Sequence, residues 1–447
     1  MKSVLLSIAI ITIACINPSA SAQPYYIPFQ IPDHPAVNRA NLGIAFGADG
    51  NRFYVSGQGN FIGPDTSPGG VYQFDRNTYQ YIQTYAPVDH PWDDFYGRAM
   101  QYDDGVFLVT APYAQNPSGF NHGAAYLIDP VNGSILNTFE HDVGAIPSGF
   151  FGASVSINDA GIFVGGTFYG PSREGNVFVY HPTNHNLMVT LAPDPATPDI
   201  RYGQKIDHND DYLVVSAPGH DTANVEGAVY VYDFISGALL YRLTSPIPDP
   251  NGTARFGHEI KLAGNLLLVG VFEFAPLNLR SKVFVYDLTT GNLVHTLTPD
   301  NGDIHSRFGF SMSVEDNIAV ISAERDNDVV IHGGAVYIYD LNTFELIDKV
   351  RTPMLNRPFM QFGSTVHIQD GTIFASAIDP RVKDIQTDQR VIYILEQFCR
   401  GDINLDGNRN FLDVSAFLKF AIDFNEDGSF NFLDISAFLQ SFAEDCP

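Results

Sequence analysis

Basic residues are scarce in this chain of 447 residues, which has 24 Lys and Arg against 50 Asp and Glu and a formal net charge of −26. Nucleic acids and anionic membrane surfaces both reward positive charge. The deficit therefore argues against both as partners, and it fits an exported protein that holds divalent cations. Hydrophobic residues make up 45% of the chain, so it can still bury a large core.

Long apolar runs are also missing. The run Val4–Cys15 is too short for a membrane span, which needs roughly 20 apolar residues as a helix. Lys2 precedes this run, and Ala20 and Ala22 supply small residues for cleavage after position 22. A charged start, a short apolar core and an A-x-A site are typical of a secretory signal peptide. We therefore expect residues 1–22 to be removed and the mature chain to be secreted or held at the cell surface, with no membrane span.

Cysteine is rare, with three in the chain. Cys15 leaves with the signal peptide; a lipid-modified Cys15 is the alternative, although Thr12 suits that modification poorly. Cys399 and Cys446 remain, at the two ends of the C-terminal segment. In an oxidising compartment such a pair predicts a disulfide bond, and two free thiols are the alternative.

Familiar catalytic motifs are absent from the sequence. It contains no G-x-S-x-G, no repeated Asp box, and no H-E-x-x-H, because His258-Glu259 lacks the second histidine. The 13 histidines occupy no shared position, so a single one, such as His208 or His367, is more simply structural than catalytic. We expect no catalytic residues and no organic cofactor. An enzyme that assembles residues from several parts of the chain is the alternative.

An aromatic-glycine pair, in contrast, recurs at steps of 50 to 55 residues, and a period in this range indicates a repeat architecture. The pairs are Phe46-Gly47, Tyr96-Gly97, Phe151-Gly152, Tyr202-Gly203, Phe256-Gly257, Phe308-Gly309 and Phe362-Gly363.

Each repeat contains four short runs rich in Val, Tyr, Leu and Ile and bounded by Gly, Asp or Pro, as strands are. In the fourth repeat they cover residues 204–208, 212–217, 228–233 and 239–244. Seven such units predict an all-β fold, a seven-bladed β-propeller over residues 23–398. The last repeat ends with a third strand at 391–398, and an unpaired edge is avoided in proteins. We expect residues 25–31 to supply the missing fourth strand and close the ring.

The loops between second and third strands are long and varied, and in alternating strands they share one face with the connections between blades. Variable loops on a rigid scaffold often bind ligands, so we expect a carbohydrate or protein ligand on this loop face; a merely tolerated surface is the alternative. The prominent side chains predicted there are Trp92, Tyr113, Phe120, Tyr169, His220 and Arg325.

The aromatic-glycine anchor, the Ala-Pro pairs at 111–112 and 217–218, and the third-strand pattern G-x-V-Y-V-Y-D resemble the FG-GAP repeats of integrin-type propellers. The resemblance covers about residues 40 to 398. Integrin blades often carry a D-x-D-x-D-G calcium loop, but none occurs here before residue 402, so calcium in the blades is not implied. Kelch and WD repeats rely on recurrent tryptophan and match less well, since Trp92 stands alone.

The C-terminal segment holds two oxygen-rich loops, each followed by apolar residues at helical spacing. Calcium takes six to eight oxygen ligands, and an EF-hand loop supplies them from positions 1, 3, 5, 7, 9 and 12. Two copies with glycine at position 6 predict two bound Ca²⁺ ions; a pair of Asx-rich turns without metal is the alternative. The predicted ligands are Asp402, Asn404, Asp406, Asn408, Asn410 and Asp413 in the first loop, and Asp423, Asn425, Asp427, Ser429, Asn431 and Asp434 in the second.

A doubled loop with Asp at position 12 and no entering helix resembles a type I dockerin. The resemblance implies a small all-α module over residues 399–447 that docks onto a cohesin-like partner in a calcium-dependent way. Positions 10 and 11 depart from the cellulosomal pattern, because they are Phe411-Leu412 and Phe432-Leu433. A calcium-locked cap, closed by Cys399 and Cys446, is the alternative to a docking device.

Together these features predict a secreted, non-catalytic binding or adhesion scaffold whose C-terminal module docks to protein in an extracellular assembly. One alternative is a carbohydrate-active hydrolase or lyase that uses the propeller face. The other is a passive surface-layer protein with a calcium-stabilised cap.

Overall fold

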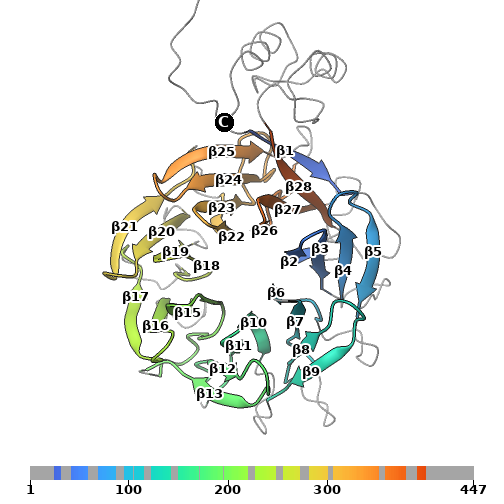
Figure 1. The fold of residues 1–447 in the computed structure, drawn as a ribbon. Coiled ribbons are helices and arrows are strands. Elements are labelled where there is room, and N and C mark those ends of the chain that lie inside the picture. Colours follow the sequence, from blue (N-terminus) through green and yellow to red (C-terminus); the bar gives the residue numbers. More distant parts are fainter. Residues whose placement is uncertain are drawn as a thin grey trace, which may run out of the picture. The chain divides into compact units, whose positions relative to one another are not determined.

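Seven four-stranded antiparallel sheets are arranged around a centre (Figure 1). The chain is seen in a computed structural model, which describes residues 25–31, 42–58, 69–86, 95–103, 105–114, 122–141, 150–170, 172–194, 196–219, 227–247, 255–271, 281–300, 306–351, 358–378 and 390–398. The prediction of an all-β, seven-bladed propeller is confirmed.

Each sheet is one blade, and blades are numbered here in chain order. Blades 1 and 2 contain β2 (Leu42–Asp49), β3 (Arg52–Gly57), β4 (Gly70–Asp75), β5 (Tyr81–Tyr85), β6 (Met100–Asp103), β7 (Val106–Ala111), β8 (Ala124–Ile128) and β9 (Ile135–Phe139). Blades 3 and 4 contain β10 (Phe151–Asn158), β11 (Gly161–Gly166), β12 (Asn176–Tyr180), β13 (Leu187–Leu191), β14 (Ile206–His208), β15 (Tyr212–Ala217), β16 (Ala228–Asp233) and β17 (Leu239–Thr244).

Blades 5 and 6 contain β18 (Ile260–Ala263), β19 (Leu266–Val271), β20 (Lys282–Asp287), β21 (Asn292–Leu297), β22 (Phe308–Glu315), β23 (Ile318–Ala323), β24 (Ala335–Asp340) and β25 (Glu345–Arg351). Blade 7 is built from β26 (Val366–Gln369), β27 (Thr372–Ile378), β28 (Arg390–Phe398) and β1 (Tyr25–Gln30). Thus β1, from the start of the chain, lies beside β28 as the fourth strand of the last blade.

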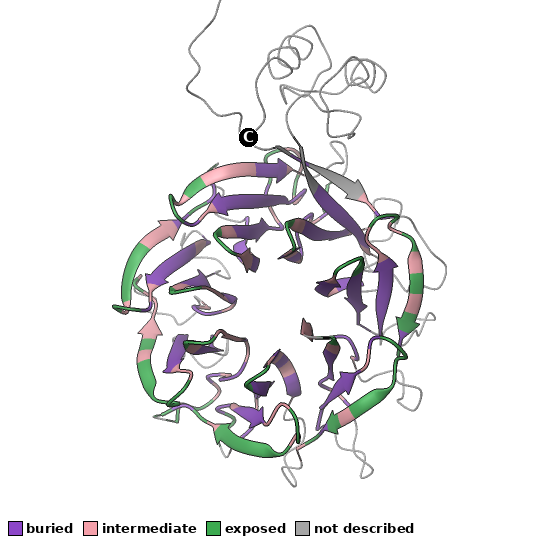
Figure 2. Cartoon of the chain, viewed as in Figure 1, coloured by how far each residue is buried: buried purple, intermediate pink, exposed green. Residues whose placement is uncertain are grey.

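The core lies between neighbouring blades, because the middle strands are buried on both faces. In blade 4, β16 is buried from Ala228 to Tyr232, whereas the outermost strand β17 is largely exposed. Figure 2 shows the same gradient, from buried inner and middle strands to exposed outer ones. Each of the large side chains in this core contributes about 2 kcal/mol or more by leaving water.

The glycine of each aromatic-glycine anchor is required by its backbone and its neighbours. Gly203 has a φ of +86°, and a Cβ there would lie 2.7 Å from the Asn176 carbonyl oxygen in the preceding blade. Its own N–H donates to the Ser216 carbonyl, 3.0 Å away, within blade 4. A left-handed φ with no room for a side chain is satisfied by glycine alone. The anchor therefore sets the close approach between neighbouring blades.

In the first blade the anchor is Leu42-Gly43, not Phe46-Gly47 as the sequence pattern predicted. Leu42 pairs with Gly57 as Phe308 pairs with Ala323 in blade 6. Gly43 has the positive φ of an anchor, +76°, whereas Gly47 does not. Leu42 lies 54 residues before Tyr96, so the corrected spacing matches that of the later repeats better. An aliphatic side chain fills the aromatic position here, which hid the anchor.

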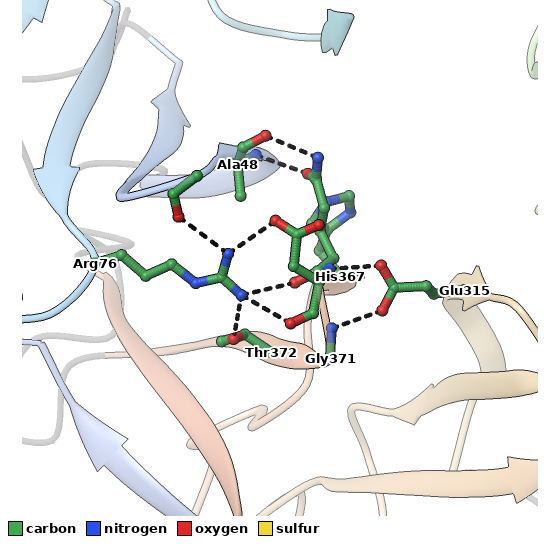
Figure 3. A network of polar contacts seen from close by, with 9 residues as sticks. Ala48, Arg76, Glu315, His367, Gly371 and Thr372 are labelled. Carbon is green, nitrogen blue, oxygen red and sulfur yellow. Dashed lines mark hydrogen bonds and ion pairs between the residues drawn. The ribbon is translucent and has the colours of Figure 1, made fainter.

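Blade 1 is joined to blade 7 by a polar network around Arg76, in the turn after β4 (Figure 3). The Arg76 guanidinium donates to the Asp370 carboxylate at 2.8 Å, to the Asp370 carbonyl at 2.9 Å and to Thr372 Oγ1 at 2.6 Å. Gln369 forms a two-way pair with the Ala48 backbone, at 2.7 Å in each direction. Five donor positions on one guanidinium let it join several acceptors at once. The network ties the first blade to the last.

Candidate functional site

A tight turn lies at the start of each of blades 2 to 7, before the innermost strand or within its first residues. We call it the rim turn, and it contains the residue before the anchor aromatic, the aromatic-glycine pair, and the residue after the glycine. Its last N–H donates to its first carbonyl, as from Arg98 to Phe95 at 3.2 Å and from His258 to Arg255 at 3.1 Å. The first residue is left-handed in several blades, with φ of +52° at Phe150 and +58° at Arg201. Because this strain recurs, it belongs to the repeat rather than to one site.

First and last residues of the rim turns, together with residues that follow the second strands, line a pocket of about 560 Å³, here called the central pocket. Its lining residues are Gln58, Phe95, Arg98, Pro112, Tyr113, Phe150, Ala153, Thr167, Phe168, Arg201, Gln204, Pro218, Arg255 and His258. These described residues come from blades 1 to 5, and none of them is Asp or Glu. A pocket of this volume is large enough for a small organic ligand.

One part of the central pocket is an aromatic row that crosses blades 2 and 3. The ring centroids are 4.5 Å apart between Phe95 and Tyr113, 4.7 Å between Tyr113 and Phe150, and 5.1 Å between Phe150 and Phe168. These rings are tilted or edge-on to one another, the arrangements that aromatic quadrupoles favour. The row offers rigid apolar surface to a ligand.

The remaining part of the pocket is cationic. Arg201 lies over the Phe168 ring, with its guanidinium carbon 5.4 Å from the centroid, so it joins the aromatic row to the cations. Arg98 is exposed to solvent but lies in a concave site. Burial within this site lowers its pKa, and the nearby Tyr113 opposes the shift. Among the described residues no carboxylate forms an ion pair with Arg98.

The pKa of His258 is affected by the positive charges around the pocket. Burial lowers its pKa well below the usual value, and the positive charges of Lys205, Arg255, Arg307 and Arg98 lower it further. Its ring also lies 5.1 Å from the Phe310 ring. Since a protonated imidazole would add a charge to a cationic cluster, His258 is neutral at pH 7.

Glu259 and Glu324 are described carboxylates close to this cluster, and each is paired. Glu259 accepts from Lys205 at 2.5 Å, and Glu324 accepts from Arg307 at 2.6 Å. Both carboxylates are buried, so they are committed to their partners.

The residues predicted on the loop face have different roles. Tyr113 lines the central pocket. Tyr169 is instead a core residue, because its hydroxyl donates to the His122 and His141 carbonyls at 3.1 Å and its side chain is buried. Arg325 lies 3.9 Å from the Glu324 carboxylate. Trp92, Phe120 and His220 lie outside the described residues.

His208 and His367 lie on innermost strands and contact neighbouring residues that fix their positions. His208 Nδ1 is 2.6 Å from Ser156 Oγ in the preceding blade, and His367 Nε2 is 3.1 Å from Gln369 Oε1. Burial lowers the pKa of both imidazoles, to about 4 for His367. These contacts agree with the structural role expected from the sequence.

The predicted calcium ligands and both C-terminal cysteines lie outside the described residues. These are Asp402, Asn404, Asp406, Asn408, Asn410, Asp413, Asp423, Asn425, Asp427, Ser429, Asn431 and Asp434, with Cys399 and Cys446. Within the described part of the chain, no group of three His, Cys, Asp or Glu residues could hold a metal ion.

The cationic part of the pocket was missed from sequence, although its signal was present. Arg98, Arg201, Arg255 and Arg307 each directly flank an aromatic-glycine anchor, in a chain with only 24 basic residues. Reading the flanking positions as a column through the repeats would have found them. The anchor itself drew attention to the positions that build the fold, not to those beside it.

Residues 292–339 match a family model described as an FG-GAP repeat. The match begins at β21, the outermost strand of blade 5, and ends within β24 of blade 6. A search of curated proteins finds no match to the chain. Among the described residues, no helix combines the length and apolar character that a membrane crossing requires. The chain thus contains an FG-GAP repeat within a seven-bladed propeller.

Proposed function

We propose that this protein is a secreted, non-catalytic binding scaffold whose propeller takes a ligand in the central pocket. The observation that carries the proposal is the described lining of that pocket, which combines an aromatic row with arginines and includes no Asp or Glu. Concave sites with apolar surface and a few polar groups are where proteins bind small ligands. The FG-GAP repeat supports the proposal, because propellers of this type often serve as adhesion or binding scaffolds.

The proposal assigns a second role to residues 399–447, as a calcium-binding module that docks the propeller onto a protein partner. Its support is the pair of loops with oxygen-bearing residues at all six EF-hand ligand positions. Binding of two Ca²⁺ ions would offset the repulsion among these carboxylates. A disulfide between Cys399 and Cys446 would hold the ends of the module together.

An array of neutral and charged oligosaccharides and peptides, probed with the full mature chain, tests the pocket. We expect a retained ligand that is lost in Phe150→Ala, which interrupts the aromatic row. Phe344→Ala is the matched control, because Phe344 is also partly buried but lies in the β24–β25 turn. A wild-type protein that retains nothing would overturn the scaffold proposal and favour a passive surface component.

The calcium module is tested by thermal unfolding of the full chain with calcium and with chelator. We expect calcium to raise the unfolding temperature, and Asp406→Asn with Asp427→Asn to remove the increase. Asp159→Asn, in the exposed β10–β11 turn, is the control. Surface plasmon resonance with a purified cohesin module then separates the two roles: calcium-dependent binding supports docking, whereas calcium stabilisation without binding supports a cap.

A second candidate function, a polysaccharide lyase, is favoured by one observation, the neutral His258 close to Arg98 and Arg255. In β-elimination a base takes the proton beside a uronate carboxylate, the C–O bond to the next sugar breaks, and the leaving oxygen takes up a proton. Arginines would neutralise the carboxylate, and His258 would act as the base. Ultraviolet absorbance of an unsaturated product, absent in His258→Gln, would support the lyase. A hydrolase needs a pair of carboxylates, and none of the described residues that line the pocket is Asp or Glu.

A further inference from the structure

The charge of the central pocket is opposite to that of the chain around it. The protein carries a net charge of −26, yet Arg98, Arg201 and Arg255 line one pocket, and none of the described residues that line it is Asp or Glu. Arginine is suited to carboxylate, sulfate and phosphate groups because its planar fork donates two parallel hydrogen bonds. A concave site of one charge sign also concentrates ligands of the opposite sign.

The cations and the aromatic row are held in contact. Arg201 of blade 4 lies over Phe168, and Arg173 lies over the same ring at 4.8 Å. A ligand that fills the pocket therefore meets apolar ring faces and guanidinium groups within one volume of about 560 Å³. Aromatic rings offer apolar faces on which flat or ring-shaped groups pack. The pairing selects a molecule that has both a ring and an anionic group.

We propose that the central pocket binds an organic anion whose carboxylate, sulfate or phosphate group is attached to a ring, as in an acidic sugar residue. This inference rests on the proposed function, and it names the class of ligand for the same pocket. The ring lies against the row Phe95, Tyr113, Phe150 and Phe168, and the anionic group lies toward Arg98, Arg255 and His258.

Proton uptake follows from the surroundings of His258. Lys205, Arg255, Arg307 and Arg98 face it as cations, while Glu259 and Glu324 are paired with Lys205 and Arg307. A bound anion offsets part of this positive charge and stabilises the imidazolium. Binding then raises the pKa of His258 and takes up a proton, so affinity increases as pH falls toward the pKa of the bound state.

Calorimetric titration of the full mature chain tests the inference with four probes: trigalacturonate, a sulfated galactotriose, neutral galactotriose and inorganic sulfate. We expect at least one charged trisaccharide to bind roughly tenfold or more tightly than the neutral one, since hydrogen bonds to charged groups are stronger than neutral ones. The two charged probes show whether carboxylate or sulfate is preferred. Equal affinity for neutral and charged sugars would overturn the inference, as would binding of inorganic sulfate alone.

Two variants locate the anion within the pocket. Arg98→Gln should weaken charged probes roughly tenfold and leave the neutral probe unchanged. Arg242→Gln, on the exposed outermost strand β17, is the matched control and should change neither. Wild-type affinity for the charged probes should rise as pH is lowered from 7.5, and His258→Gln should remove that dependence. An Arg98→Gln protein that binds charged probes as tightly as wild type would contradict the assignment.

The two levels of proposal fail in different ways. If the array retains a neutral ligand that Phe150→Ala loses, the scaffold function stands and the anionic ligand class is wrong. If neither the array nor the titrations show a ligand, the scaffold function fails as well.

Discussion

Gly43 and Gly47 lie four residues apart on one strand but differ in what a methyl group would meet. At Gly43 an added Cβ would lie 2.8 Å from Ser376 Cβ and 2.5 Å from Ile392 Cδ1 in blade 7, at a φ of +76°. At Gly47 the closest atom is Tyr102 Cβ, 3.0 Å away, and the backbone is not left-handed. The first residue therefore carries the backbone constraint that every later anchor carries.

We expect Gly43→Ala to lower the free energy of unfolding by about 2 kcal/mol, because left-handed strain and a steric clash add. Gly47→Ala should cost less than about 1 kcal/mol, since it adds only the contact. Urea unfolding of both variants checks the difference. A Gly47→Ala protein that is the less stable of the two would restore Phe46-Gly47 as the anchor.

His367 links stability to pH. Burial lowers its pKa to about 4 from an ordinary 6.5, so between these values the unfolded chain binds more protons than the folded one. Above pH 6.5 the imidazole is neutral in both states, and as pH falls toward 4 its protonation in the unfolded chain lowers the free energy of unfolding. Because the side chain is partly exposed, we expect this loss to be about 2 kcal/mol. Urea unfolding at pH 7.5 and 4.5 should show a smaller acid loss in His367→Gln than in wild type; equal losses would exclude this residue as a cause.

At the scale of the element, the outer strand of blade 6 buries an ion cluster. Lys349 on β25 is 4% exposed and lies 3.1 Å from Asp326, which is 2% exposed. It also contacts Asp328, and it lies 2.9 Å from Asp300. Burial alone lowers the pKa of Lys349, but the carboxylates outweigh it and the net shift is upward. The ammonium is the charge that permits Asp326 to be buried.

Lys349→Met should destabilise the protein by about 3–5 kcal/mol, because it leaves a buried carboxylate without a cation. Adding Asp326→Asn to this variant should recover part of the loss. Arg351→Met removes a more exposed partner of Asp328, at 3.6 Å, and should cost less than about 1 kcal/mol. Chemical denaturation of the three variants measures these values. A double variant no more stable than Lys349→Met would show that lost packing, not charge, is responsible.

Elements with continuous apolar runs were the predictable part of the fold. The strands expected at 212–217, 228–233 and 239–244 coincide with β15, β16 and β17, because their apolar residues match buried or sheet-edge positions. The innermost strand was expected from 204 but begins at Ile206, since Gln204 closes the rim turn with a hydrogen bond to the Arg201 carbonyl. The hydrophobic pattern of the sequence predicts strands well, whereas turns depend on backbone angles that the sequence does not show directly.

At the scale of the whole molecule, ring closure depends on contacts between the two ends of the propeller sequence. Arg76 is 17% exposed and donates to blade 7 at residues almost 300 positions away. We expect Arg76→Gln to cost about 2 kcal/mol, because several acceptors lose a charged donor. Arg242→Gln, on an outermost strand, should have little effect. Denaturation curves for both test this, and an equal, small effect would mean that strand pairing alone closes the ring.

The central pocket could not be predicted by examining one repeat, because residues from several blades line it. Its lining runs from Gln58 to His258, and the ring alone brings these residues together. The repeat predicted the propeller, because each unit buries its core against the next. The pocket depends on how the units differ, which is visible only after they are superposed.

The rim turn separates two tasks that many sites combine in the same residues. Its aromatic and glycine hold the blade, while its first and last side chains are not needed for that purpose. Exchanging Phe95 and Arg98 for other residues would thus alter the pocket wall of one blade and leave its anchor intact. Substitutions at these positions can therefore change the ligand selectivity of the pocket one blade at a time.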